Sequence, residues 1–213
     1  VKNPLPSLSL PLRWRTYLKQ ILSVAKWTAV AALAITVADN LDILMVQSLM
    51  SSYDAGIWSG AVRIAAFANL AGWSIGAVLN VRVARYSDGD HLGTYLRKAW
   101  KLSLAVFLLI LAVIPLAGLG VHYTIGASYA LSILPLQILL VSIALSSAAV
   151  PYIALFYVFE STEYYAISGL LQTALLVAGD LYFIPQYGLL GSAWVRVGVR
   201  LALLVFTLYY ATL

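Results

Sequence analysis

Cysteine is absent from this sequence, and charged residues are scarce. Without cysteine the chain has no disulfide, no thiolate metal site and no cysteine nucleophile. Asp, Glu, Lys and Arg make up only 10% of the 213 residues, whereas soluble domains average about 25%. Hydrophobic residues make up 62%, and the mean hydropathy is +0.92. These values exclude an ordinary soluble domain and predict an all-α, polytopic membrane protein.

Signatures of catalysis and of nucleotide binding are also missing. The sequence has no G-x-x-x-x-G-K-[ST] loop, which excludes an ATP site of that type. No Ser/His/Asp or Cys/His arrangement can be assigned to a common pocket, so an enzyme is the least expected class. His91 and His122 have no second His or Cys at ligand spacing. We therefore expect no metal, no cofactor and no nucleic acid partner.

Six apolar stretches are long enough to cross a bilayer, which takes about 20 helical residues. Residues 1–19 combine Pro and Ser with basic and aromatic residues, and we expect a linker and an interfacial helix there. Residues 20–213 are expected to form a six-helix transmembrane bundle. The predicted spans are residues 26–50, 56–82, 102–119, 131–159, 164–184 and 189–212. Turns near Tyr53 and Tyr187, a polar connection at 82–101, a loop at 120–130 and a kink at Pro151 are expected between or within them.

The basic residues gather on one side of these spans. If the N-terminus is cytoplasmic, that side carries ten of the 13 Lys and Arg residues, five within residues 1–26 and five within 82–101. The opposite loops carry none, as the positive-inside rule requires. We expect a multi-pass protein of the inner (plasma) membrane, with both ends of this segment cytoplasmic. The chain starts at Val1 without an initiator Met, which suggests a fragment of a longer protein, and no signal peptide is recognised before the first span.

Charged residues also occur inside the predicted spans. Asp39 and Asp42 share one face of a helix, and a hairpin folded about Tyr53 places Asp42 opposite Arg63. A single Asp or Arg at mid-membrane costs roughly 2.5 to 3.5 kcal/mol on insertion scales. We therefore predict a buried pair between Asp42 and Arg63, for which a purely structural role and a substrate or ion role are equally open.

The last two spans carry a second charged group. A turn near Tyr187 brings Asp180 and Arg196 to similar depth, where they too can pair. Arg196 and Arg200 are four residues apart, so they lie on one helical face. If Asp180 neutralises Arg196, then Arg200 either stays unpaired in the bundle or extends to the membrane surface.

Four stretches are similar to those of one transporter family. NLDILMVQSLMSSYDAGIWSGAVRIAAF resembles the opening hairpin of the C-terminal half of bacterial polysaccharide flippases, in the multidrug/oligosaccharidyl-lipid/polysaccharide exporter superfamily. The others resemble that family's polar loop, a later turn with its apolar helix, and the start of a late helix: VARYSDGDHLGTYLRKAWKLSL, IGASYALSILPLQILLVSI and FIPQYGLLGSAWVRVGVRL. The chain departs from the family where Asp180 replaces a frequent Asn, and where LNVRVARY lacks a frequent Pro.

The resemblance implies one six-span half of a two-bundle flippase fold around a central cavity. It implies the flipping of a polyprenyl-pyrophosphate-linked oligosaccharide across the inner membrane, by alternating access, for lipopolysaccharide or exopolysaccharide biosynthesis. The implied partners are this lipid-linked oligosaccharide, membrane lipids, a missing N-terminal half or a second copy of the chain, and H⁺ or Na⁺. A cation-coupled multidrug exporter and a non-transporting membrane subunit that binds a partner protein remain open alternatives.

Phosphate recognition follows from the arginines. Guanidinium groups bind phosphate oxygens with two parallel hydrogen bonds, and they attract anions strongly in a medium of low dielectric constant. We therefore predict that Arg63, Arg196 and Arg200 bind the substrate phosphates. Ion coupling or charge pairing is predicted for Asp39, Asp42 and Asp180.

Overall fold

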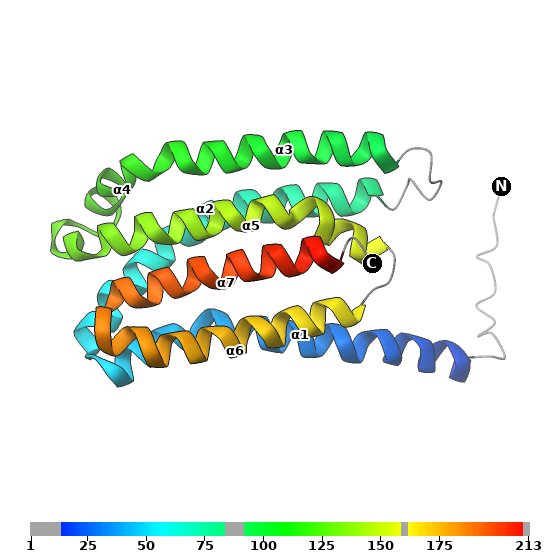
Figure 1. The fold of residues 1–213 in the computed structure, drawn as a ribbon, viewed down its shortest axis with the longest axis horizontal. Coiled ribbons are helices and arrows are strands. Elements are labelled where there is room, and N and C mark those ends of the chain that lie inside the picture. The colour runs from blue at the N-terminus through cyan, green and yellow to red at the C-terminus, as the bar shows by residue number, and fades with distance from the viewer. Residues whose placement is uncertain (1–13, 84–91, 159–161, 211–213) are drawn as a thin grey trace, which may run out of the picture.

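The computed structural model describes residues 14–83, 92–158 and 162–210, and these residues form a helical bundle without a strand (Figure 1). The helices in chain order are α1 (Trp14–Leu49), α2 (Ser52–Val83), α3 (Leu92–Val113), η2 (Ile114–Leu116), α4 (Ala117–Thr124), η3 (Ala127–Ser132), α5 (Ile133–Val158), α6 (Thr162–Tyr187) and α7 (Leu189–Tyr210). The prediction of an all-α fold is confirmed.

Within the described residues, six helical segments are long and apolar enough to cross a membrane. They are Ala25–Leu49, Ser52–Leu79, Tyr95–Thr124, Ala127–Ile153, Ala166–Tyr187 and Leu189–Tyr210. Each one overlaps a span predicted from hydropathy. The chain is therefore a six-span helical bundle, as the sequence indicates for a multi-pass membrane protein.

The first turn lies earlier in the chain than predicted. It consists of Met50 and Ser51, and α2 starts at Ser52, so the centre of the turn is not at Tyr53. Ser51 fixes this start, because its hydroxyl accepts a hydrogen bond from the Asp54 backbone N–H at 3.1 Å and donates one to the Asp54 carboxylate at 2.5 Å. This exchange caps the N-terminus of α2. The register of the hairpin therefore differs from the predicted one.

The predicted loop at 120–130 is wrong over most of its length. The chain leaves helical structure only at Ile125 and Gly126, between α4 and η3. Both of their backbone N–H groups donate to the Val121 carbonyl at 3.1 Å, and Gly126 adopts a φ of 93° that favours glycine. The Thr124 hydroxyl also donates to the Gly120 carbonyl at 2.6 Å. Carbonyl groups of α4 thus accept from the two backbone N–H groups that follow it and from the Thr124 hydroxyl, which helps a loop-like composition to remain helical.

Two segments that we expected outside the spans are continuous with them. Trp14–Leu49 is one helix, so no break follows residue 19, and α3 runs without interruption from the polar connection into the third span. Pro151 lies inside α5 as expected, and the last turns of α5 bend away from its axis (Figure 1). The predictions for residues 1–13 and for the SDGD turn at 87–90 lie outside the described residues.

The hairpin of α6 and α7 is packed unusually closely. A single residue, Gly188, separates the two helices and has a φ of 58°. A Cβ atom on Gly179 would lie 2.6 Å from Val195, and one on Gly191 would overlap the backbone carbonyl of Phe183. These glycines allow the backbones to approach closely and hold the two helices in one register.

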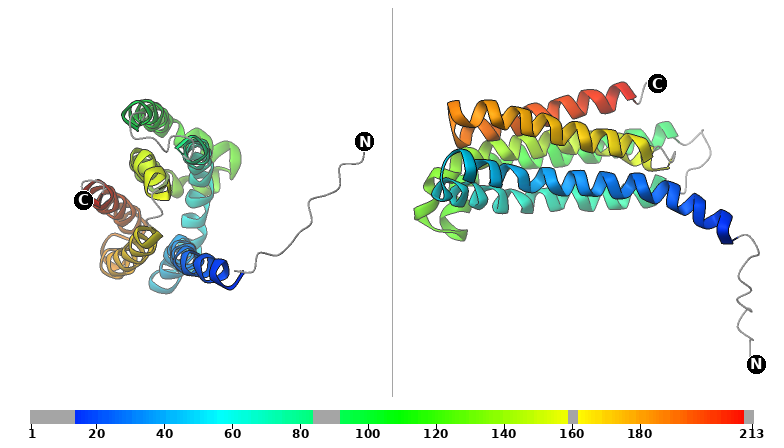
Figure 2. Two further views of the ribbon diagram at one scale, coloured as in Figure 1. Left: turned by 90° about the vertical axis from the view of Figure 1, so that its right-hand side faces the viewer. Right: turned by 90° about the horizontal axis from the view of Figure 1, so that it is seen from below.

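The bundle has two distinct ends. α1 begins and α7 ends at what we call the terminal end, and the turns at Met50–Ser51, Ile125–Gly126 and Gly188 lie at the opposite, turn end (Figure 1). α1 packs mainly on α6 and α2 mainly on α5, which also contacts α3 and α7. α1 and α2 therefore separate as they leave their common turn (Figure 2).

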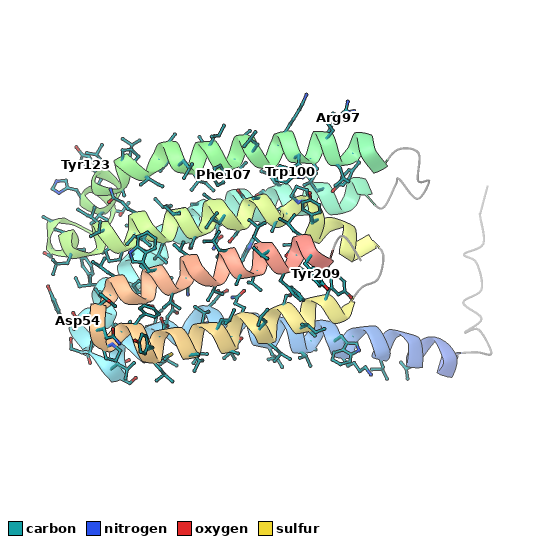
Figure 3. All side chains as sticks on the ribbon, viewed as in Figure 1. Asp54, Arg97, Trp100, Phe107, Tyr123 and Tyr209 are labelled. Carbon is teal, nitrogen blue, oxygen red and sulfur yellow. The ribbon has the colours of Figure 1, made fainter. Side chains whose placement is uncertain are left out.

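Charge is distributed unevenly along this axis. Arg97 lies near the terminal end, whereas Asp54 and Tyr123 lie at the turn end (Figure 3). The Lys and Arg side chains described on α1 and α3 all lie in the half of their helix nearer the terminal end: Lys26, Arg97, Lys98 and Lys101. The described part of the chain thus keeps the basic asymmetry on which the orientation prediction depends.

Candidate functional site

Two adjoining cavities lie among α1, α2, α5, α6 and α7, at the depth of the membrane spans. The smaller has a volume of about 310 Å³, and we call it the arginine compartment because Arg63, Arg196 and Arg200 line it. The larger has a volume of about 520 Å³, and we call it the hydroxyl compartment after Ser146, Ser147, Ser168, Tyr164 and Thr207 in its wall. Both are lined by Asp39, Asn69, Trp73, Ile143 and Arg200, so the two cavities share a boundary.

The arginine compartment brings together the residues predicted to bind phosphate. Arg63 comes from α2, whereas Arg196 and Arg200 come from successive turns of α7. Asp39 of α1 is the sole carboxylate in its lining. Three guanidinium groups therefore face one carboxylate around a common space, which is an arrangement that attracts anions.

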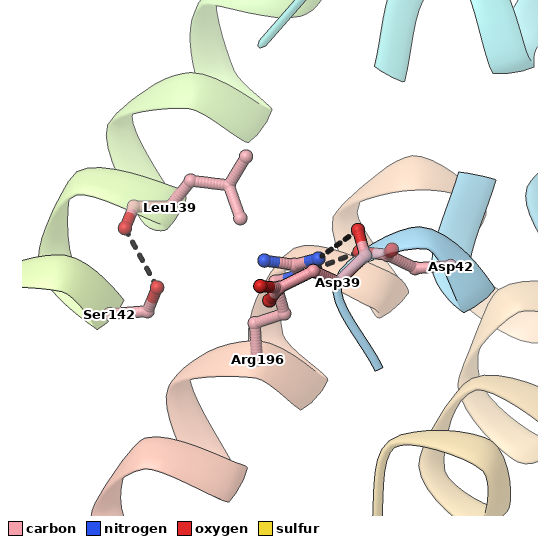
Figure 4. Close-up of polar contacts among 5 residues, drawn as sticks. All are labelled: Asp39, Asp42, Leu139, Ser142 and Arg196. Carbon is pink, nitrogen blue, oxygen red and sulfur yellow. Dashed lines mark hydrogen bonds and ion pairs between the residues drawn. The ribbon is translucent and has the colours of Figure 1, made fainter. Parts of the chain in front are cut away.

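Asp42 pairs with Arg196, so the prediction of a pair between Asp42 and Arg63 is wrong. The Nε atom of Arg196 donates to Oδ2 of Asp42 at 2.5 Å, and its Nη2 atom donates to the Asp39 backbone carbonyl at 3.4 Å (Figure 4). The side chain of Asp42 is completely buried, and that of Arg196 is 14% exposed. This pair joins α1 to α7.

The position of the first turn explains why Asp42 does not pair with Arg63. With the turn at Ser51, Asp39 lies twelve residues before it and Arg63 lies twelve residues after it, so these two residues are level. Asp42 is only nine residues before the turn and lies about one helical turn nearer the turn end. Arg63 is accordingly exposed on α2 and shares the arginine compartment with Asp39.

Asp180 does not form the predicted ion pair with Arg196. Its side chain is completely buried, and neither carboxylate oxygen has a hydrogen bond of good geometry, although the Ser192 hydroxyl lies close enough to interact. Oδ1 of Asp42 also has no hydrogen-bond partner, and the Ser192 hydroxyl has only its contact with Asp180. Buried oxygen atoms from α1, α6 and α7, with few hydrogen-bond donors, thus lie near Arg196. Such a site suits H⁺ or a small cation, because burying unpaired polar groups is costly.

Arg200 has a neutral partner. Its Nη1 atom donates to Oε1 of Gln172 at 3.1 Å, and the Gln172 side chain is buried on α6. Within the described residues Arg200 forms no salt bridge, and the carboxylate that acts on it is that of Asp39. The guanidinium is therefore oriented without being neutralised, and it remains available to an anion.

Sequence analysis missed Gln172 and the hydroxyl groups of the larger cavity. Tyr164 and Thr207 share a hydrogen bond of 2.5 Å, and the Ser146 and Ser147 hydroxyls donate to backbone carbonyls of their own helix. A signal was present, because GLLQTALL and ALSSAAV place polar residues in apolar spans. Small polar residues also serve helix packing in membranes, so this signal does not distinguish a binding site from an interface.

We expect the substitution Gln172→Glu to weaken anion binding without removing an arginine. The new carboxylate would lie at hydrogen-bond distance from Arg200 and neutralise it, so binding should fall roughly 10- to 100-fold, the equivalent of one charge-assisted hydrogen bond. The measurement is calorimetric titration of the purified protein with inorganic pyrophosphate. Gln172→Met is the matched control, because it has a similar length and leaves Arg200 charged. Equal losses in both variants would show that Gln172 acts only through packing.

Neither a metal centre nor a known relative identifies this site. Among residues 14–83, 92–158 and 162–210, no three His, Cys, Asp or Glu side chains are grouped so that they could hold a metal ion. Comparison of the chain with protein families, with curated proteins and with solved structures finds no match. The function is therefore argued from the geometry and charge of the two compartments.

Proposed function

We propose that this chain is one bundle of a transporter that flips a polyprenyl-pyrophosphate-linked oligosaccharide across the inner membrane for polysaccharide biosynthesis. The observation that carries the proposal is the arginine compartment, where three guanidinium groups and one carboxylate line a cavity inside a membrane-spanning bundle. A pyrophosphate has two adjacent phosphoryl groups, and arginines from α2 and α7 approach the cavity from different helices. The resemblance to polysaccharide flippases supports the same substrate.

The charge of the site favours this substrate over a cationic drug. A cation exporter needs carboxylates without basic neighbours, but Asp42 is bound to Arg196 and does not line either compartment. Asp39 lines both compartments together with Arg200. The non-transporting alternative would leave a half-buried Arg200, hydrogen-bonded to a neutral amide, without a use for its charge.

The exposure of α2 supports the two-bundle arrangement. Arg63 is exposed within the span Ser52–Leu79, and the neighbouring Phe67 and Trp73 are exposed as well. A guanidinium at this depth is costly in contact with lipid, so a protein surface should cover it. A second six-helix bundle, either another segment of the same protein or a second copy of the chain, would close the site over α2. Rocking of the two bundles would then give access to each side of the membrane in turn.

Orientation and coupling complete the proposal. The basic residues near the terminal end would lie in the cytoplasm under the positive-inside rule. Substrate would then enter from that end and leave at the turn end. The oxygens of Asp42, Asp180 and Ser192 would bind the H⁺ or Na⁺ that couples transport to the ion gradient.

The test is a flipping assay with the full-length protein reconstituted in liposomes. A fluorescent polyprenyl-pyrophosphate oligosaccharide is placed in both leaflets, and its transfer is followed by the action of an added glycosidase on the outer leaflet. We expect transfer to depend on the protein and to persist in the control variant Arg97→Ala, which changes a base outside both compartments. Export of ethidium without transfer of the lipid would indicate the multidrug alternative. Co-purification of a partner protein without any transport would indicate the subunit alternative.

A further inference from the structure

Trp73 occupies an unusual position at the junction of the two compartments. Its side chain is 69% exposed although it lies within a membrane span, and it lines both cavities. Within the described residues the indole has no aromatic contact and no hydrogen bond. A Cβ atom on Gly72 would meet nothing within 4 Å, and one on Gly76 would meet only Val150 at 3.8 Å. The indole is thus a flat apolar surface beside open space.

The larger cavity around this ring combines apolar side chains with polar groups that are mostly uncharged. Asn69 lies one helical turn before Trp73 on the same face, and Gln172 faces the larger cavity from α6. The hydroxyl groups of Ser146, Ser147, Ser168, Tyr164 and Thr207 complete the polar lining, and charge enters only through Asp39 and Arg200 at the border. Amides and hydroxyls can both donate and accept hydrogen bonds, so they match a neutral ligand with many hydroxyl groups.

We infer that the hydroxyl compartment binds the first sugar of the substrate, next to the pyrophosphate, and that one face of this sugar stacks on Trp73. The inference rests on the proposed function and deepens it. A phosphate suits the hydroxyl compartment poorly, because Arg200 is its one lining cation. A polyprenyl chain suits it less well, because it offers no hydrogen-bonding group to the amides of Asn69 and Gln172.

The arrangement assigns an order to the parts of the ligand. The pyrophosphate lies between Arg63 and Arg200, and the sugar extends from Arg200 past Trp73 toward Tyr164 and Thr207 at the terminal end. Trp73 and Asn69 then determine which sugar is accepted at the position attached to phosphate. Sugars farther along the oligosaccharide meet no part of this subsite and are not selected by it.

The test compares the binding affinities of probes with and without a sugar for the full-length protein in lipid nanodiscs. The probes are farnesyl pyrophosphate and farnesyl pyrophosphate carrying glucose, galactose or N-acetylglucosamine, and the tightest sugar probe is used for the variants. We expect Trp73→Ala to weaken that probe by about three- to tenfold, the range of an aromatic stacking contact, and to change the bare pyrophosphate by less than about twofold. Trp73→Phe should retain most of the affinity, because it keeps an aromatic face.

Controls make each outcome decisive. Trp194→Ala removes another exposed tryptophan that lines neither compartment, and we expect no change for either probe. Arg200→Ala should weaken both probes. Equal weakening of both probes by Trp73→Ala, or no weakening of either, would overturn the sugar subsite while leaving the proposed function intact. Failure of the wild-type protein to bind even the bare pyrophosphate would instead overturn the proposed function itself.

Discussion

Replacement of Arg200 with alanine is expected to abolish flipping while leaving the protein folded in the membrane. Arg200 lines both compartments, and its hydrogen-bond partner is the neutral Gln172. Removing it leaves the half-buried Asp39 beside the Arg196 guanidinium, so the cost to folding is small. The substrate would lose at least two charge-assisted hydrogen bonds of about 1.5 to 3 kcal/mol each, which corresponds to a loss of roughly 100-fold or more. The measurement is the initial rate of lipid transfer in liposomes.

Arg200→Lys separates charge from geometry in the same assay. Lysine keeps the positive charge but lacks the planar fork of donors, so partial activity is expected. Thermal denaturation in detergent should show all Arg200 variants close to the wild type. Wild-type rates of lipid transfer by Arg200→Ala would exclude this residue from substrate binding. Of the three arginines that line the arginine compartment, Arg63 would then be the one left that forms no salt bridge with a described residue.

Replacement of Asp42 with alanine is expected to destabilise the fold strongly. Its carboxylate is completely buried, and it compensates Arg196 at 2.5 Å. Removal of one partner from a buried pair costs about 3 to 5 kcal/mol, because the other charge stays buried alone. We therefore expect a large fall in the amount of folded protein and in the midpoint of denaturation by sodium dodecyl sulfate.

A second substitution tests whether the uncompensated charge is the cause. The double variant Asp42→Ala/Arg196→Met removes both charges, so it should recover most of the lost stability. Asp54→Ala is the matched acidic control, because it removes a carboxylate in the first turn of α2 that accepts a hydrogen bond from the Ser51 hydroxyl but leaves the Ser51 cap in place. We expect a loss of about 0.5 to 1 kcal/mol. A double variant as unstable as Asp42→Ala would contradict a role for Asp42 in compensating Arg196.

The two arginines of α7 therefore have different roles, which the sequence alone does not separate. Both lie on one face of the same helix, four residues apart. What distinguishes them is the partner: a buried carboxylate from α1 for Arg196 and a buried amide from α6 for Arg200. These partners lie 154 and 28 residues away in the chain. Helical spacing describes neighbours within one helix and carries no information on such contacts.

Properties set by length and composition could be predicted, and properties set by tertiary register could not. Hydropathy locates the six spans because crossing a membrane requires about 20 apolar residues whatever the packing. The three arginines were predicted to act together, and the fold does place them around one cavity. The partner of Asp42 was predicted wrongly because a shift of two residues in one turn changes which side chains are level. The Ser51 cap that sets this shift is a local contact of a single hydroxyl group.

Because α1 and α7 pack against each other only slightly, the ion pair between Asp42 and Arg196 can control how these two helices move relative to each other. α1 packs mainly on α6 and contacts α7 over only a short length. The ion pair between Asp42 and Arg196 is therefore a main link between α1 and α7. A substrate phosphate that binds Arg196 while a proton neutralises Asp42 would release this contact without leaving either charge uncompensated, and the tight α6–α7 hairpin would stay in place. α1 would then be able to pivot on α6 and widen the mouth of the cavity beside α2. Ligand occupancy and the width of that mouth would thus be controlled by the same two side chains.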